Sequence, residues 1–319
     1  MSHEIEHVAG KACMAWASDG DTPWHNLGKK VDPDLTPEQM LVEAGLSWTV
    51  RKEQAYLNLS GGDGGLVKVP DTFALVRSSD DKILDVVSDD WKEIQNIEAF
   101  EFFNDFVAAG DMSMHTAGSL KGGTIVWALA KIKDSFDLGG KDLVEAFMLF
   151  TNYHKYGFST DVRFSPIRVV CANTLQLSLN AAANAVKVSH RKKFDGDEVK
   201  LTLGVAAEKL AKYKEMASYL SNKRYSDEGL IEYFMRLWPL AEDSKRGISR
   251  NAERALEAVE TQPGHELFPG TWWDAYNSAT YMVDHEIGRT DDSRLTSAWY
   301  GAGKNLKLQA LELACEMAA

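Results

Sequence analysis

The residues with the clearest chemical potential lie in one basic segment, residues 161–224. This segment holds twelve Lys and Arg against six Asp and Glu, a net charge of +6, whereas the whole chain carries −12. Residues 1–160 have a net charge of −11, and residues 225–319 have a net charge of −7. A local excess of cations inside an acidic protein favours an anionic ligand.

Two groups within this segment have the residue types that contact phosphate. The first comprises Arg163, Arg168 and Asn173, because a guanidinium near the free N–H groups of a helix beginning at Asn173 would suit a phosphate. The second is a dense run: Lys187, His190, Arg191, Lys192 and Lys193. The alternatives are that Asn173 only caps a helix while the arginines pair with acids, and that the second group is a solvated loop.

Aromatic side chains precede these cations in the chain. The base-stacking candidates are Tyr153, His154 and Tyr156, which sit among Lys155 and Phe158. Aromatic rings interleaved with cations are typical of a groove for single-stranded nucleic acid, since rings stack on bases and cations meet phosphates. The alternative is that these rings pack an edge strand.

The sequence carries no complete catalytic or metal-binding signature. Residues 116–123 lack the GxxxxGK[ST] order of a Walker A loop and are expected to form a flexible hairpin tip. Asp284, His285 and Glu286 are consecutive, so on a helix they point about 100° apart and cannot all converge on one ion. No GxSxG, GxGxxG or recognisable Cys-His pair occurs. We expect no metal, no cofactor and no catalytic residue, and an enzyme ranks below a binding protein.

The elements that must position these residues belong to the α+β class. Strands are predicted at 48–59, 66–69, 73–77, 83–87, 112–116, 124–132, 146–153 and 162–170. Short links join the first of them, which indicates an antiparallel β-meander. Packed helices are expected at 36–44, where Thr36, Pro37 and Gln39 fit a capping box, and at 97–109.

The second half of the chain is predicted to be mostly helical. Helices are expected at 173–185, 197–221, 227–240, 248–260, 271–288 and 303–317. We therefore predict an α+β domain with an antiparallel sheet at 1–195. A helical domain or helical extension follows at 196–319.

The composition is that of an ordinary globular protein, with 45% apolar and 26% charged residues. The N-terminus has neither the basic nor the apolar region of a signal peptide, and no run of about 18 apolar residues predicts a membrane span. Cys13, Cys171 and Cys315 show no CxxC spacing, which argues against a disulfide framework and a cysteine zinc site. We expect a cytoplasmic protein with no membrane partner.

Several sequence blocks resemble a known family. They are WHNLG at 24–28, VVS at 86–88 with Trp91 and IQN at 94–96, TAGSL at 116–120, RVVCANTL at 168–175 and GTWWDAYN at 270–277. Together they resemble the phage/plasmid-like protein family, a domain of unknown function in phages, plasmids and related mobile elements. The resemblance implies a bacterial host cell and carries over no catalytic residue. A weaker likeness, of architecture and charge alone, is to the ring-forming single-strand annealing proteins of phages.

Three functional hypotheses follow. The leading one is a mobile-element protein that binds or anneals single-stranded DNA in recombination or replication, with a homo-oligomeric ring or filament as its assembly. The second is an acidic protein-interaction module that binds a host defence or repair protein, because both flanks of the basic segment are acidic. The third is a phosphate-ester or nucleotide-processing enzyme that uses Arg168 and the expected helix start at Asn173.

Overall fold

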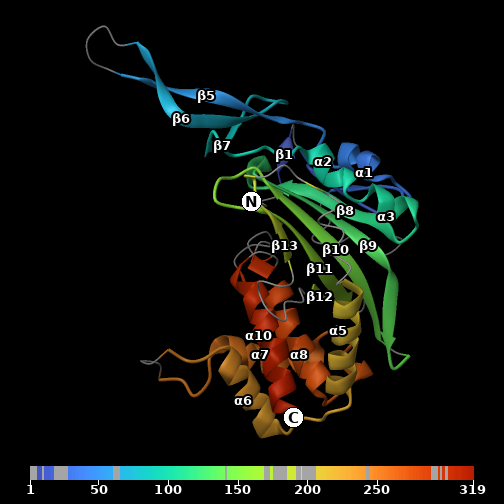
Figure 1. Ribbon diagram of the computed structural model, residues 1–319. Coiled ribbons are helices and arrows are strands. Elements are labelled where there is room, and N and C mark those ends of the chain that lie inside the picture. The colour runs from blue at the N-terminus through green and yellow to red at the C-terminus, as the bar shows by residue number, and fades with distance from the viewer. Residues whose placement is uncertain are drawn as a thin grey trace. The chain divides into compact units, whose positions relative to one another are not determined.

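In the computed structural model, the chain forms two compact units (Figure 1). Unit 1 comprises Met1–Lys133, Met148–Arg163 and Ala185–Thr202, and unit 2 comprises Asp134–Phe147, Phe164–Asn184 and Leu203–Ala319. The predicted α+β class is confirmed, since strands are concentrated in the N-terminal half and helices dominate the C-terminal half. The predicted domain boundary near residue 195 stays a prediction. The structure describes residues 6–8, 11–17, 28–59, 65–140, 142–168, 173–174, 185–191, 195, 206–241, 245–288, 294, 297–298 and 301–319.

Unit 1 contains a three-stranded antiparallel sheet in the order β5-β6-β7. Its strands are β5 (Val50–Asn58), β6 (Leu66–Arg77) and β7 (Ile83–Ser88). The single strand β6 replaces the two separate strands predicted at 66–69 and 73–77. The register shifts between Gln54 and Tyr56, where the Gln54 amide donates to the carbonyls of Val69 and Thr72. The strand ladder is irregular here because Pro70 has no N–H to donate. The Gln54 amide pairs with the carbonyls of Val69 and Thr72, on either side of this irregularity.

A larger sheet has the strand order β12-β11-β10-β9-β8-β3-β4, and β13 pairs with β11 off this path. Its strands are β3 (Met14–Trp16), β4 (Lys29–Lys30), β8 (Met112–Leu120), β9 (Ile125–Leu138), β10 (Asp142–Tyr153), β11 (Thr160–Arg168), β12 (Asn173–Thr174) and β13 (Ala185–Val188). A separate short pair joins β1 (His7–Val8) and β2 (Lys11–Ala12). Strands β8 to β11 are neighbours in chain order, while β3 and β4 are parallel. The predicted meander corresponds to the separate β5-β6-β7 sheet.

The hairpin tip expected at residues 116–123 is shorter than predicted. Residues up to Leu120 belong to β8, and only Lys121–Gly123 form the turn before β9. Ser119 is fully buried, and its hydroxyl donates to Glu6 Oε2 at 2.8 Å. Glu6 also forms an ion pair with the buried Arg77 at 2.5 Å. Residues 116–120 are therefore held in the interior of unit 1, whereas Lys121 in the turn is exposed.

The helices of unit 1 confirm one prediction and correct another. Helix α1 (Pro37–Glu43) has the predicted capping box, formed by the side chains of Thr36 and Gln39. The single helix predicted at 97–109 is wrong, because α2 (Asn96–Glu101) and α3 (Asn104–Ala108) are separate. The break falls at Phe102 and Phe103, which are both buried. Both residues keep right-handed helical backbone angles, but Phe103 N–H donates to the carbonyl of Phe100, three residues back, so the α-helical hydrogen-bond pattern is interrupted by a tighter turn.

The helix predicted at 173–185 is wrong at both of its ends. Asn173 and Thr174 form β12, opposite Arg168 and Ile167 of β11, and Ala185–Val188 form β13 on the same strand. Residues 175–184 lie outside the described part of the chain. Asn173 therefore begins no helix, because pairing with β11 satisfies its backbone in an extended conformation. The helix start on which the expected phosphate contact depended is therefore absent at Asn173.

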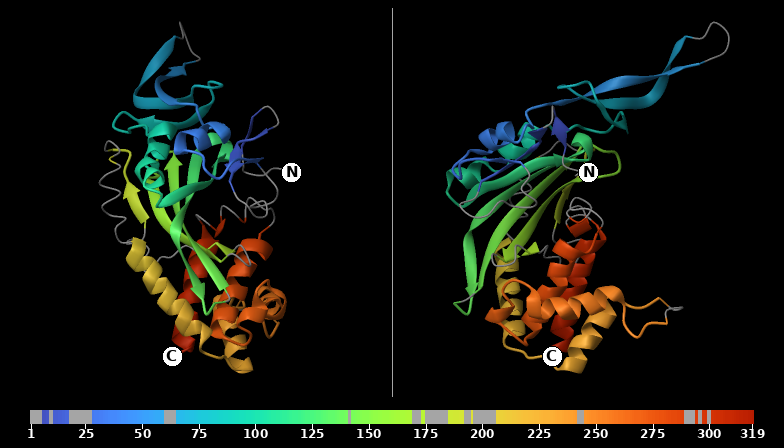
Figure 2. Two further views of the ribbon diagram at one scale, coloured as in Figure 1. Left: turned by 90° about the vertical axis from the view of Figure 1, so that its right-hand side faces the viewer. Right: turned by 180° about the vertical axis from the view of Figure 1, so that it is seen from behind.

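Unit 2 is mostly helical, as Figures 1 and 2 show. Its helices are α5 (Ala206–Ser221), α6 (Asp227–Leu237), α7 (Arg250–Thr261), α8 (Trp272–Tyr281) and α10 (Ala302–Met317). Residues 272–280 of α8 are all buried, and α8 contacts α5, α7 and α10. A π-helical turn, Met282–Glu286, extends α8. Within the described residues, no helix combines the length and the apolar character needed to cross a bilayer.

Candidate nucleic-acid interface

Two segments of unit 1 meet along β11. The turn at 154–159 joins β10 to β11, and β13 pairs with the first half of β11, with Thr160 opposite Val188. Extending this antiparallel register by two residues brings His190 level with Phe158. The turn and the end of β13 therefore lie side by side, although they are about thirty residues apart in the sequence.

Both segments are also held by residues 85–92. Tyr156 N–H donates to Asp85 Oδ2 at 2.8 Å, and Arg191 forms an ion pair with Asp90 at 3.3 Å. Lys92 N–H donates to the carbonyl of His190, whose Nδ1 lies 2.9 Å from the carbonyl of Lys92. These contacts hold His190, Arg191 and the aromatic turn against one common segment.

Five exposed side chains on this edge are cationic or aromatic, and we call them the edge surface: Lys155, Tyr156, Phe158, Lys187 and Arg191. Tyr156 is 51% exposed and Phe158 is 48% exposed. The Arg191 side chain is 72% exposed despite its ion pair. Lys155 Nζ lies 5.3 Å from the ring centroid of Phe158, within cation–π distance. The edge surface thus presents two large rings among three cations.

A buried polar network, which we call the anchor, adjoins the edge surface. It comprises Asn96, Asn152, His154, Thr160 and His190, each at most 3% exposed. The network bonds the end of β10 and the start of β11 to the segment that precedes α2. The anchor therefore sets the position of the turn that carries the exposed aromatics.

The hydrogen bonds of His154 define its tautomer. The Asn96 amide donates to the carbonyls of Leu46 and Trp48, so its Oδ1 is free to accept. His154 Nε2 lies 2.8 Å from that oxygen and must carry the proton, while Nδ1 has no hydrogen-bond partner among the described residues. Burial, and then the charges of His190 and Arg77, lower the pKa of His154 to about 3. His154 is therefore neutral at physiological pH.

His190 is held in the same uncharged state. Its Nδ1 faces the Lys92 carbonyl, which can only accept, so Nδ1 carries the proton. The ring stacks on Trp91, with centroids 4.3 Å apart and planes 14° apart. Burial lowers the pKa of His190, although the hydrogen bond to Lys92 opposes this shift. Its role is to fix the chain just before Arg191.

The structure separates the predicted site residues by burial. Lys187, Arg191 and Tyr156 are exposed, as a binding role requires. Tyr153 is 6% exposed and His154 is fully buried, so neither offers a ring face to a base in this conformation. His190, at 3% exposed, is likewise closed to a phosphate in this conformation.

The remaining predicted residues do not join the edge surface. Arg163 is mostly buried and forms an ion pair with Asp161 two residues earlier. Arg168 and Asn173 lie opposite each other on β11 and β12, and their side chains are outside the described part of the structure. Lys192 and Lys193 also lie outside the described residues. Their phosphate-binding roles stay predictions.

Sequence reasoning left two residues of the edge surface out of its candidate site, Lys155 and Phe158. The available signal was their position in the same short turn as Tyr156, because a turn exposes consecutive side chains that a strand would divide between two faces. Phe158 also stacks on the buried Tyr153 at 5.1 Å, which holds its ring in place.

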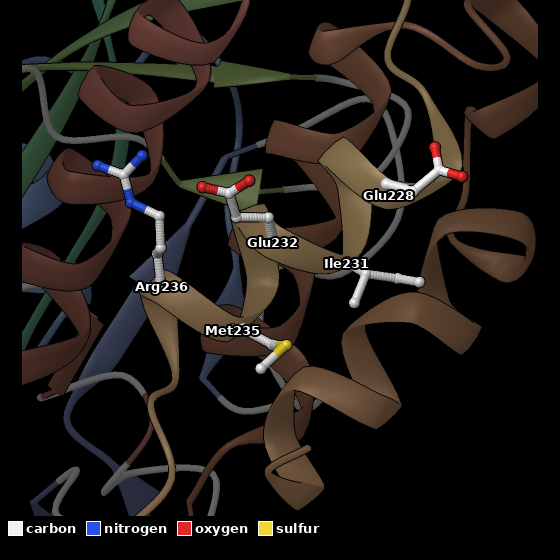
Figure 3. Close-up of a pocket in the computed structure, with 5 residues that line it drawn as sticks. All are labelled: Glu228, Ile231, Glu232, Met235 and Arg236. Carbon is white, nitrogen blue, oxygen red and sulfur yellow. The ribbon is translucent and has the colours of Figure 1, made fainter. Parts of the chain in front are cut away.

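A shallow depression in unit 2 has a different chemistry (Figure 3). All its lining residues come from one face of α6: Glu228, Ile231, Glu232, Met235 and Arg236. Arg236 donates to Glu316 at 2.9 Å, so its charge is already balanced. The two carboxylates make this surface unsuitable for phosphate. Among the described residues, no group of three potential metal ligands comes together.

Comparison with known proteins assigns this α+β chain to a family. The family model described as a domain of unknown function (DUF932) matches residues 83–299. Because this match covers more than half of the chain, the protein belongs to the DUF932 family. The matched region includes the edge surface and the anchor, and four of the five sequence blocks, all except 24–28. No curated protein and no solved structure matches the chain.

Proposed function

We propose that this protein binds single-stranded nucleic acid, with DNA as the substrate, through the edge surface of unit 1. The observation that carries the proposal is the exposure of Tyr156 and Phe158 beside Lys155, Lys187 and Arg191. Exposed rings stack on unpaired bases, and neighbouring cations neutralise the phosphates between them. The proposed binding site therefore consists of five side chains, of which Lys187 and Arg191 come from the basic segment and the other three from the turn before it.

The ion pair between Arg191 and Asp90 does not prevent phosphate binding. Both side chains are more than half exposed, and exposed ion pairs contribute little to stability. A phosphate can form a bidentate contact with the guanidinium and replace the carboxylate. The small size of the edge surface also favours a short contact with a flexible strand over a long contact with a duplex.

The acidic remainder of the chain supports a preference for single strands. Residues 1–160 and 225–319 are both strongly acidic, so a rigid duplex extending past the edge surface would meet electrostatic repulsion. A single strand can follow the cationic edge and expose its bases to Tyr156 and Phe158. Bases stacked inside a duplex offer no free face to these rings.

We place this activity in the recombination or replication of a mobile element, within the cytoplasm of a bacterial host. The support for this part of the proposal is the resemblance to phage/plasmid-like proteins, together with the weaker likeness to phage annealing proteins. It predicts that the protein promotes pairing of complementary strands once it has bound them.

The experiment that tests the binding site is charge reversal with a matched control. Lys187→Glu combined with Arg191→Glu should weaken binding of a single-stranded oligonucleotide, and the slope of log K against log salt should fall by about 1.4. Lys212→Glu combined with Lys214→Glu changes the net charge equally at exposed positions of unit 2 and should preserve the slope. Equal effects of the two double variants would mean that binding, if any, is not at the edge surface.

A further inference from the structure

The outer part of the β5–β6 sheet is a two-stranded ribbon with unusual exposure. We call residues 55–59 and 65–70 the distal ribbon; it extends past the end of β7, as Figures 1 and 2 show. Five apolar side chains of the ribbon are about half exposed or more: Tyr56, Leu57, Leu59, Leu66 and Val67. Leu57 and Val67 form a cross-strand pair on one face, whereas Tyr56 and Leu66 lie on the other. Both faces of the ribbon are therefore apolar.

These side chains together expose on the order of 500 Å² of apolar surface, divided between the two faces of one small projection. A standard protein interface buries about 800 Å² on each partner. The apolar side chains of the ribbon are therefore one part of such an interface, and the paired backbone of β5 is the other. An isolated two-stranded ribbon is only marginally stable in water, so a partner would also stabilise its fold.

Along the ribbon, the outer backbone edge of β5 has no neighbouring strand among the described residues. At its start the edge is covered, because the Gln95 side chain accepts from Val50 N–H at 2.9 Å and donates to its carbonyl at 2.8 Å. The Lys52 side chain also ties this end of β5 to the segment before α2, because its Nζ donates to the carbonyls of Asp89 and Trp91. Beyond this point, β5 pairs only with β6 among the described strands. Unpaired N–H and C=O groups on an edge strand are a template for another strand.

The near-neutral charge of the ribbon favours a second copy of this chain over a nucleic acid as its partner. Residues 55–70 contain one cation, Lys68, and one anion, Asp63, in a chain of net charge −12. A nucleic acid would find a single cation there, which is too few for a phosphate backbone. A second copy of this acidic chain meets least electrostatic repulsion at a neutral element. A lipid bilayer is disfavoured, because an open strand edge leaves backbone groups unsatisfied in hydrocarbon.

We propose that the distal ribbon is a self-association element that docks against the same ribbon of a second copy. The open edges of the two β5 strands pair antiparallel about a two-fold axis and form one continuous sheet. Such an isologous contact places the exposed Tyr56, Leu57 and Leu59 of each β5 strand beside the same side chains of the other copy. This inference does not depend on the proposed nucleic-acid binding, because the ribbon and the edge surface share no residue.

The test compares the mass of the full chain in solution, by light scattering and sedimentation velocity, over a range of concentrations. Wild type should form a dimer. Leu57→Glu combined with Val67→Lys replaces an apolar cross-strand pair by an opposite-charge pair, which keeps the ribbon paired while removing its apolar surface. This variant should weaken dimerisation by about 100-fold or more.

The matched control is Ile83→Lys combined with Val86→Glu on β7. Both residues are as exposed as those of the ribbon, and the substitutions introduce the same two charges. The control should dimerise like wild type, and circular dichroism should show that both variants fold. Monomeric wild type at all concentrations, or equal effects of the two variants, would overturn the proposal.

Two further measurements separate the alternatives. Single cysteines placed in turn at positions 53 to 58 should include at least one that forms a disulfide-linked dimer on oxidation, because two-fold pairing brings identical positions together. Failure of all six to cross-link would exclude pairing between β5 edges. Co-sedimentation of wild type, but not of the ribbon variant, with phosphatidylcholine and phosphatidylglycerol vesicles would make the ribbon a membrane element and overturn self-association.

Discussion

The anchor and the edge surface of unit 1 are built from nearly the same stretches of sequence but differ in burial. His154 is fully buried, and Tyr156, two residues later, is half exposed. His190 is buried against Trp91, and Arg191 beside it projects into solvent. The polar atoms of the anchor residues form hydrogen bonds with one another and with buried backbone carbonyls. The charges and rings of the edge surface remain exposed to a ligand.

This contrast shows that residue type alone does not identify a binding side chain. Aromatic and basic residues around 153–158 and 187–191 all have suitable chemistry, and burial separates those that support the site from those that form it. The anchor should therefore control stability and the edge surface should control affinity. If variants of the anchor and of the edge surface changed stability and affinity to the same extent, the comparison would be wrong.

The largest expected effect belongs to the anchor. His154→Ala leaves Asn96 Oδ1 without its donor and opens a cavity beside Trp48, whose ring centroid lies 5.2 Å from that of His154. A cost of about 3 kcal/mol is expected from the lost packing and the unpaired buried acceptor. Urea unfolding followed by tryptophan fluorescence measures it. Tyr156→Ala is the matched control and should shift the unfolding free energy by less than about 0.5 kcal/mol.

A smaller effect concerns pH and also belongs to the anchor. Burial lowers the pKa of His154 to about 3, below the 6.5 of an unperturbed histidine, so protonation favours the unfolded chain. Stability present above pH 6.5 should be lost as the pH falls towards 3. The loss attributable to His154 amounts to about 2 kcal/mol at pH 5.

The difference between wild type and His154→Gln isolates this contribution, because burial also lowers the pKa values of His115 and His190. Unfolding free energies measured at pH 7, 6 and 5 should converge for the two proteins as the pH falls. Parallel curves would show that His154 is not neutral and buried as described.

The smallest predicted effect belongs to the edge surface. Tyr156→Ala should weaken binding of a single-stranded oligonucleotide by about 1 kcal/mol, or roughly fivefold, because one stacking ring is lost. The salt slope should stay unchanged, since no charge is removed. Tyr156→Phe retains the ring and should bind like wild type, as should Tyr153→Phe, which alters only a buried side chain. If Tyr153→Phe weakened binding as much as Tyr156→Ala does, exposure would not distinguish the residues that bind from those that support the site.

Local sequence signals predicted those parts of the fold that local chemistry determines. The capping box at Thr36 and Gln39 forms as expected, and the apolar periodicity of the second half predicted most of its helices. The incorrect predictions concern elements whose structure depends on contacts with residues distant in the sequence. Asn173 is a good helix start by type, but its backbone pairs with β11. The apolar periodicity of 97–109 gave no sign of the tighter turn at Phe102 and Phe103 that separates α2 from α3.

The sequence predicted where in the chain the candidate site lies, but not which side chains there are exposed. Charge counting identified the segment that contains Lys187 and Arg191, because an excess of cations is visible in any sequence. Burial of His154 and His190 depends on Asn96 and Lys92, which are 58 and 98 residues distant, and no local pattern encodes such contacts. The two strands of the distal ribbon were predicted, but their exposure was not, because consecutive apolar residues such as Tyr56 and Leu57 are equally typical of a strand buried on both faces.

The most direct test of the central claim is the affinity of wild-type protein for a fluorescent single-stranded oligonucleotide, measured by anisotropy against salt concentration, with the matched duplex alongside. The account predicts tight binding of the single strand, weaker binding of the duplex, and log K that falls linearly with log salt. No binding of either form at low salt, or a duplex bound as tightly as the single strand, would contradict it.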